Sequence, residues 1–474
     1  MIYKTCTTEN YTCTKNYHTN TINSNSHVSI YNKVYGFLYL LSAMLAFIPI
    51  TAKAAFWHSA TTGTALRCTM VEPEKPASDY DGKVMTVVYL TNTACEKIGQ
   101  VSNEENIEWM KRQGYRIFVI DYAHHEKSIS PYINKDIIAL NKALNCGTFC
   151  GQDGISTDRA YILFEGYRIR RDVAYFHDDP KVYNYPEEYS TMEGDSLFMD
   201  IIYPEKPTRK VATLLSFSYS NSYAGTAKEG YTEKYRHKRI FLGYTFAMFD
   251  DSFLEGAPAV GVAWAIADHP KYCDWGRGNR KGGQQKEYGS IEVNPDAAQK
   301  VRSAIRTLRA EGKTLGLNGE IALYGFSRGS TAASLAIGDM PMSEWSGTER
   351  GRFPEERAEI SKAFLGPGIF DYSITSSDSH EYRNMSVYCS TKQKTEKAWE
   401  QQGGAKAIKK KAVPCFLFYN SSDDAEYGRQ MDNLREILER TKTRYEIMVD
   451  YGTGHSVPKE QEQLERMYRF LITQ

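Results

Sequence analysis

The sequence predicts an α/β fold in which a mostly parallel sheet carries helices on both faces, preceded by a smaller α/β region. Two observations predict it. Strand-like and helix-like segments alternate in residues 83–168 and again from residue 197 to the C-terminus. In residues 321–339 an apolar run then passes through the pentapeptide GFSRG into small, helix-forming residues. Helices that return the chain to the same edge of a sheet make successive strands parallel.

The first part of the chain has the layout of an export signal. Residues 1–32 are rich in Thr, Asn and Ser, and we expect them to be disordered. The uncharged apolar run 34–50 follows Lys33 and precedes Ala52-Lys53-Ala54, which predicts a signal peptide at about residues 34–54, cleaved after Ala54. A membrane anchor is the alternative, for which this run is at the short limit. We expect a secreted or periplasmic protein without stable membrane insertion after cleavage.

Residues 55–190 are expected to form an N-terminal α/β region, and residues 191–474 the catalytic domain. In the first region we expect strands at 83–91 and 115–122, helices at 103–113 and 134–144, and an extended segment at 160–168. None of its turns carries a nucleophile motif, so no catalytic role of its own is expected. The polar segment 177–189 predicts the boundary.

The second part repeats the alternation over a longer stretch. Expected strands cover residues 197–203, 211–218, 363–370, 415–419 and 444–450, with one apolar element at 259–267. A helix is expected at 294–311, because apolar residues recur at helical spacing and Gly312 follows. An amphipathic helix closes the chain.

The pentapeptide Gly325-Phe326-Ser327-Arg328-Gly329 has the form G-x-S-x-G and stands where a strand meets a helix. A serine on such a tight turn adopts a strained backbone and projects its hydroxyl. Glycines two residues to either side avoid collisions with the neighbouring strand and helix. The spacing therefore predicts that Ser327 is a nucleophile.

A nucleophilic serine needs a base and an acid that orients the base. Downstream of Ser327 the histidines are His380 and His455, and only His455 follows a strand and an acidic loop. That loop holds Asp423 and Asp424; we expect Asp423 to be the acid, with Asp424 as the alternative. The resulting chain order is serine, acid, histidine.

From about residue 192 onward the chain resembles an α/β-hydrolase of the secreted carbohydrate-esterase and prolyl-oligopeptidase-like branch. The resemblance rests on GDSLFMDIIYPE, VATLLSFSYSN, GFSRGS, NSSDD and GTGHS. It implies the α/β-hydrolase fold, a serine triad, and an oxyanion hole built from the backbone N–H groups of Arg328 and Tyr219, with Ser220 as the alternative to Tyr219. Members often carry His-Gly-Gly at the second position, whereas this chain has Ser218-Tyr219-Ser220.

Charge and cysteine content indicate which kinds of partner and cofactor to expect. Lys plus Arg equals Asp plus Glu at 58 each, so no net charge favours nucleic acid or anionic membranes. Neither histidines nor paired cysteines recur at metal-ligand spacing, and we expect neither a metal nor an organic cofactor. Cys146 and Cys150 are close enough to form a disulfide in an exported protein.

Three further motifs have ordinary interpretations. Gly194-Asp195-Ser196-Leu197 spells the signature of another serine esterase family, but its polar context predicts a turn that opens a strand. His124-His125 are expected at the surface. GRGNRKGG lacks the ending and the preceding strand of a phosphate-binding loop.

The sequence thus predicts a secreted serine hydrolase of carboxylic esters. The resemblance implies acyl groups on carbohydrate, so the partner is a small-molecule or polysaccharide ester. A serine peptidase of the prolyl-oligopeptidase type is one alternative, although the long β-rich domain of that class is not evident in residues 55–189. A non-catalytic binding protein on the same fold is another, and acyl transfer or carbon–carbon hydrolysis would use the same residues.

Overall fold

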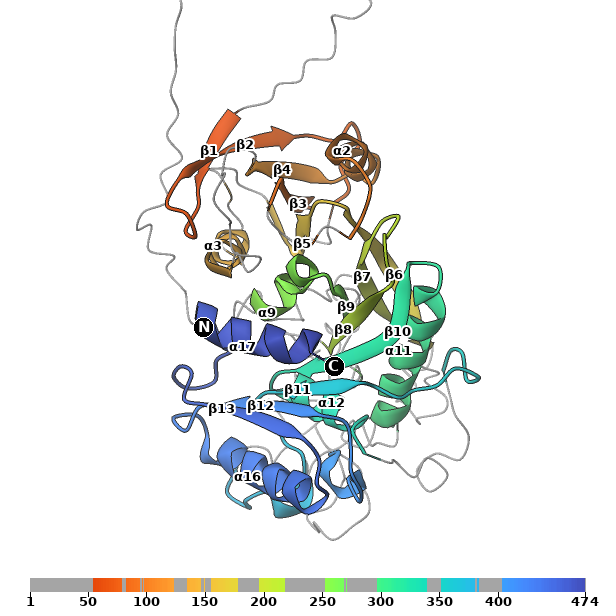
Figure 1. The fold of residues 1–474 in the computed structure, drawn as a ribbon, viewed down its shortest axis with the longest axis vertical. Helices are drawn as coiled ribbons and strands as arrows, with labels where there is room; N and C mark the ends of the chain where they lie inside the picture. Colours follow the sequence, from red (N-terminus) through yellow and green to blue (C-terminus); the bar gives the residue numbers. More distant parts are fainter. Residues whose placement is uncertain are drawn as a thin grey trace, which may run out of the picture.

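The computed structural model describes residues 54–78, 82–93, 96, 98–122, 134–145, 149, 155–177, 196–217, 252–267, 270, 296–338, 351–379, 382 and 403–473, which form two β-sheets and their helices (Figure 1). Outside these residues lie the leader, the apolar run 34–50, His124-His125, Cys146, Cys150, Tyr219, GRGNRKGG and His380. Within them, no helix is both long and apolar enough to span a membrane.

The first sheet has five strands in the order β1-β2-β4-β3-β5. Its elements are β1 (Ala54–His58), β2 (Ala65–Val71), β3 (Val84–Thr91), α2 (Asn103–Arg112), β4 (Arg116–Asp121), α3 (Asn134–Asn145) and β5 (Ile155–Phe164). Strand β3 runs parallel to both β4 and β5, as predicted from the alternation. Strands β1 and β2 add an antiparallel hairpin that was not predicted.

The second sheet has eight strands in the order β13-β12-β11-β10-β8-β9-β7-β6. They are β6 (Tyr167–His177), β7 (Ser196–Pro204), β8 (Val211–Phe217), β9 (Ala263–Ala267), β10 (Leu317–Gly325), β11 (Lys362–Leu365), β12 (Cys415–Tyr419) and β13 (Tyr445–Val449). All neighbouring strands from β9 to β13 pair in parallel, and β7 is antiparallel to both of its neighbours. The mostly parallel sheet is confirmed.

The predicted extended segment 160–168 proves to be two strands that belong to different sheets. Strand β5 ends at Phe164, and β6 begins at Tyr167 in the second sheet. The turn between them includes Gly166, whose φ is 79°, a conformation that glycine adopts without strain. Strand β6 precedes the expected boundary at residues 190–191, yet it pairs with β7 of the second sheet, and both strands bury apolar side chains in one cluster.

Helices cover both faces of the second sheet. They are α9 (Ser252–Glu255), α11 (Asp296–Gly312), α12 (Arg328–Ser334), α16 (Ala425–Arg440) and α17 (Gln461–Ile472), with 3-10 turns η2 (Ala257–Val260), η4 (Tyr372–Ile374) and η5 (Ala405–Ala407). Leu323 packs on one face with Ile305 of α11. Its neighbour Tyr324 lies in the other cluster with Phe253 of α9, because successive strand side chains point to opposite faces.

Two predicted elements are shorter than expected. The apolar segment 259–267 comprises the end of η2 and then β9, separated at Gly261, whose φ is 76°. The segment 363–370 forms a strand only to Leu365, because Gly366-Pro367-Gly368 follow.

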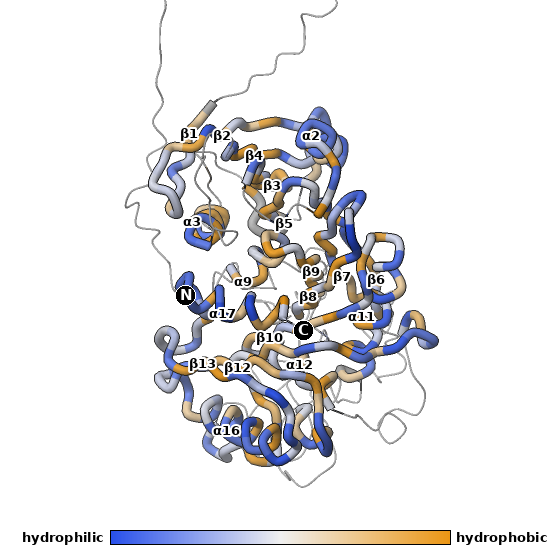
Figure 2. Tube along the Cα trace, viewed as in Figure 1, coloured by the Kyte–Doolittle hydropathy of each residue, from blue (hydrophilic) through white to orange (hydrophobic). Residues whose placement is uncertain are grey.

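One hydrophobic cluster joins the two sheets. It includes Val88 of β3, Phe364 of β11 and Tyr468 of α17. Helix α3 contributes by packing against β5 as well as against α9 and α17. Figure 2 shows hydrophobic residues along the central strands and hydrophilic ones along the outer sides of α2 and α16. The N-terminal sheet and the second sheet thus share one hydrophobic core.

Candidate active site

Ser327 occupies a strained turn at the carboxyl end of a central strand. Its φ is 55° and its ψ is −124°, between β10 and α12. Positive φ is uncommon for a residue with a side chain, and a ψ of −124° lies outside the ordinary left-handed region, so the backbone of Ser327 is strained. A Cβ on Gly325 would lie 2.4 Å from the oxygen of Gly329 and 2.4 Å from the Cα of Ser330. Only glycine fits there, as the motif predicted.

The segment after β11 holds this turn from one side. A Cβ on Gly368 would lie 2.9 Å from the backbone oxygen of Ser327, so the two backbones are in close contact. Ser330 Oγ donates to the Gly366 oxygen at 2.8 Å, and the N–H of Ile369 donates to Thr331 Oγ1 at 3.1 Å. These bonds fasten the first turn of α12 to the neighbouring strand end.

Asp423 and His455 form a close pair. Asp423 Oδ2 lies 2.7 Å from His455 Nδ1, and the two side chains are 7% and 23% exposed. Both residues lie in loops, one after β12 and the other after β13, and these two strands are parallel neighbours. Parallel strands end at the same edge of a sheet, so the two loops meet there.

The neighbouring acids have other partners. Asp424 caps α16, because its Oδ1 accepts the N–H of Glu426 at 2.9 Å. The Glu426 carboxylate in turn accepts the N–H of Ser376 at 3.0 Å and pairs with Arg429 at 2.9 Å. Of these three carboxylates, Asp423 is the one bonded to His455.

Asn420, which the sequence analysis did not single out, ties the two loops together. Its Nδ2 donates to the Gly454 oxygen at 2.9 Å and to Ser456 Oγ at 3.1 Å, and its Oδ1 accepts the N–H of Gly452 at 2.9 Å. The residue is 1% exposed. The signal available in the sequence was an asparagine directly after the apolar run Cys415–Tyr419.

A second link between these loops runs through Asp450. Both the Oγ and the N–H of Ser421 donate to Asp450 Oδ1 at 2.7 Å. Both hydrogen bonds lower the pKa of Asp450, the one from the Ser421 side chain more than the one from its backbone. The loop that holds His455 (the histidine loop) therefore begins at a charged residue, Asp450, which is hydrogen-bonded to the loop that holds Asp423 (the acid loop).

Two aromatic rings flank the His455 imidazole. The ring of Phe326 lies 4.7 Å away, and that of Tyr427 stacks at 4.9 Å with 29° between the planes. Phe326 precedes Ser327 in the motif, so the turn that holds Ser327 contacts the loop that holds His455. Tyr427, on the first turn of α16, was not predicted.

Of the two expected oxyanion donors, Arg328 lies among the described residues and Tyr219 does not. Arg328 is the first residue of α12, and a helix leaves the N–H at that position without an internal acceptor. Tyr219 lies outside the described residues, and β8 ends at Phe217, parallel to β10. Ser196 of the alternative motif begins β7, three strands from β10 in the order β10-β8-β9-β7.

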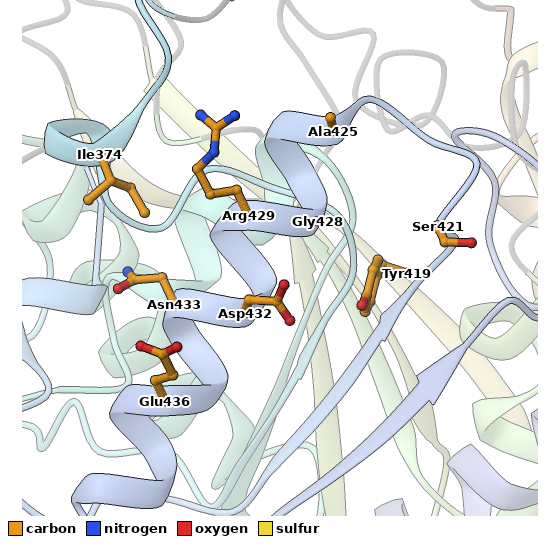
Figure 3. A pocket seen from close by; sticks show the side chains of 9 residues that line it. All are labelled: Ile374, Tyr419, Ser421, Ala425, Gly428, Arg429, Asp432, Asn433 and Glu436. Atoms are coloured by element: carbon orange, nitrogen blue, oxygen red, sulfur yellow. The ribbon is translucent and has the colours of Figure 1, made fainter.

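An open groove of about 530 Å³ lies beside the acid loop, along α16 (Figure 3). It is lined by Ile374, Tyr419, Ser421, Ala425, Gly428, Arg429, Asp432, Asn433 and Glu436. Two of its charged side chains are already paired, Arg429 with Glu426 and Asp432 with Arg435. The groove includes none of Ser327, Asp423 and His455, so it is separate from the candidate site.

Among the described residues, no group of three or more His, Cys, Asp and Glu side chains is arranged to hold a metal ion. Burial raises the pKa of the Cys415 thiol to about 12, which keeps it protonated and unreactive.

No family model matches the sequence, and no curated protein matches it. Among solved structures, the chain is similar to a truncated carbohydrate esterase from gut microbiota, with 14% identity, a TM-score of 0.45, and coverage of 65% of this chain and 96% of that one. It is also similar to the propionate-bound esterase Est2 of Thermogutta terrifontis (16% identity, TM-score 0.40, 65% and 94% covered). A third similar structure is an inhibited esterase B from Lactobacillus rhamnosis, with 13% identity, a TM-score of 0.42, and coverage of 65% of this chain and 86% of that one.

Proposed function

We propose that this chain is an α/β-hydrolase that cleaves carboxylic esters through an acyl-enzyme on Ser327. The observation that carries the proposal is the strained backbone of Ser327, with φ 55° and ψ −124°, between a parallel strand and a helix. Such a turn is the nucleophile elbow of α/β-hydrolases. The chain order Ser327, Asp423, His455 is also the order of that fold.

In the proposed mechanism, His455 acts as the base. Its Nε2 takes the proton of Ser327 Oγ as the oxygen attacks the ester carbonyl carbon. In the proposed tautomer, the Nδ1–H of His455 donates a hydrogen bond to Asp423 Oδ2, and the 2.7 Å distance between these atoms supports it. This bond selects the tautomer whose Nε2 can accept a proton, and it stabilises the imidazolium that forms.

The N–H groups of Arg328 and Tyr219 are proposed to bind the oxyanion. His455 then returns its proton to the leaving alcohol, the carbonyl re-forms, and Ser327 is left acylated. Water, deprotonated by His455, attacks the acyl carbon and releases the acid. No metal or organic cofactor takes part in these steps.

The proposed substrate is an acyl group carried on carbohydrate. Support for it comes from the resemblance of GDSLFMDIIYPE, GFSRGS, NSSDD and GTGHS to secreted carbohydrate esterases. The proposal includes export, with cleavage after Ala54 at the signal segment 34–54. That cleavage would remove only the first residue of β1, so the N-terminal sheet would stay intact.

A substrate panel tests the reaction class. Purified protein would be incubated with acetylated xylo-oligosaccharides, aryl acetates and peptide amides. Turnover of the esters, with amides at least about a hundred-fold slower in kcat/KM, is the expected result. Faster turnover of the peptide amides would favour a peptidase.

A further inference from the structure

Tyr427 stands outside the proposed triad but touches its histidine. Its ring stacks on His455 at 4.9 Å with an interplanar angle of 29°. The ring of Phe326 approaches the same imidazole at 4.7 Å. We propose that Tyr427 is a positioning residue, which holds the His455 ring toward Ser327 and stabilises its protonated form. This inference rests on the proposed function.

The helix that carries Tyr427 is fixed by a buried glutamine. Gln430 is fully buried, and its Oε1 accepts the N–H groups of Phe370 and Asp371 at 3.0 and 2.8 Å. Its Nε2 donates to the Asp371 oxygen at 2.9 Å and to Glu426 Oε1 at 3.1 Å. Breaking such a network leaves several buried polar groups unpaired, so α16 cannot shift at low cost.

The segment that Gln430 binds also contacts the elbow. Residues 366–371 follow β11, and Gly368 lies against the backbone oxygen of Ser327. Contacts therefore run in a closed circuit, from Ser327 through this segment and Gln430 to Tyr427, and back through His455 and Phe326. These contacts restrict how far the turn that holds Ser327 and the loop that holds His455 can move apart.

The stacked ring has a second effect during the reaction. When Ser327 loses its proton, the imidazole becomes a cation, and an aromatic face attracts a cation placed over it. The ring of Tyr427 is half-buried, which reduces the screening of this attraction by water. Because the attraction grows only as the charge develops, it lowers the barrier rather than tightening substrate binding.

The test compares Tyr427→Leu, Tyr427→Phe and the control Tyr445→Leu with wild type on p-nitrophenyl acetate. The tyrosine at 445 is also half-buried; it lies on β13, and its hydroxyl donates to Glu439 at 2.6 Å. Tyr427→Leu should lower kcat by about 5- to 30-fold with KM within about two-fold. Tyr427→Phe and Tyr445→Leu should both stay within about two-fold of wild type in kcat.

Labelling by a fluorophosphonate checks that each variant is folded. For Tyr427→Leu, the labelling rate constant should fall with kcat, while the final labelled fraction equals that of wild type. An unchanged kcat, a change confined to KM, or Tyr427→Phe as slow as Tyr427→Leu would overturn the inference. Retained activity in Ser327→Ala would instead contradict the proposed function, so a failure of the Tyr427 inference can be distinguished from a failure of the proposed function.

Discussion

Replacing Asp423 by asparagine changes one atom of the acid that contacts His455. The other oxygen of this side chain, Oδ1, accepts the N–H of Asp424 at 2.8 Å. Asparagine keeps that bond with its own oxygen, so its NH₂ group takes the position 2.7 Å from His455 Nδ1. An NH₂ group donates, and Nδ1 must then accept.

The consequence is the wrong tautomer of the histidine. With Nδ1 accepting, the proton moves to Nε2, which can no longer take the proton of Ser327. The same substitution in a serine protease triad lowers kcat by about 10⁴-fold, and we expect a loss of similar size in Asp423→Asn. Stability should change by less than about 1 kcal/mol, because the side chain keeps its shape and its bond to Asp424.

Asp424→Asn is the matched control. Its oxygen caps α16 through the N–H of Glu426, and asparagine caps helices about as well as aspartate. We expect kcat/KM for p-nitrophenyl acetate within about three-fold of wild type, and an unchanged melting temperature. A severe loss in Asp424→Asn alone, or mild and equal losses in both variants, would refute the assignment of Asp423.

Two further substitutions test the packing around the candidate site, and one measurement tests the predicted export signal. Gly325→Ala should abolish the activity and cost about 3 kcal/mol or more of folding stability, seen as a lower melting temperature, because its Cβ would lie 2.4 Å from backbone atoms of Gly329 and Ser330; near-normal stability would contradict the tight turn. Asn420→Ala should lower the free energy of unfolding, measured by chemical denaturation, by about 2–4 kcal/mol and should also lower kcat, because three hydrogen bonds between the loops disappear. A change below about 0.5 kcal/mol would mean that the two loops keep their conformation without Asn420. N-terminal sequencing of the exported protein should begin at or near Ala55, whereas a full-length, membrane-extractable chain would favour an anchor.

Much of this architecture follows from local patterns. The strand Cys415–Tyr419 and the start of α2 at Asn103 were predicted to the residue, because an apolar run defines the strand and Ser102 caps the helix. The contact between Asp423 and His455 was also predictable, since parallel strands bring their following loops to one edge.

What could not be predicted depends on contacts between distant segments. Nothing local to residues 160–168 says that β5 and β6 belong to different sheets; their pairing partners decide it. The same holds for Tyr427 and Gln430, which look like ordinary helix residues in the sequence. Their roles come from what they meet, His455 in one case and the backbone after β11 in the other.

The most direct test of the central claim is to find which side chain a fluorophosphonate modifies. Peptide mass spectrometry of the labelled protein should assign the adduct to Ser327, and Ser327→Ala should lose both the labelling and at least about 10³-fold of the p-nitrophenyl acetate activity. The parallel variant Ser196→Ala, altered three strands away, should keep both. An adduct on Ser196, or full activity in Ser327→Ala, would contradict the account.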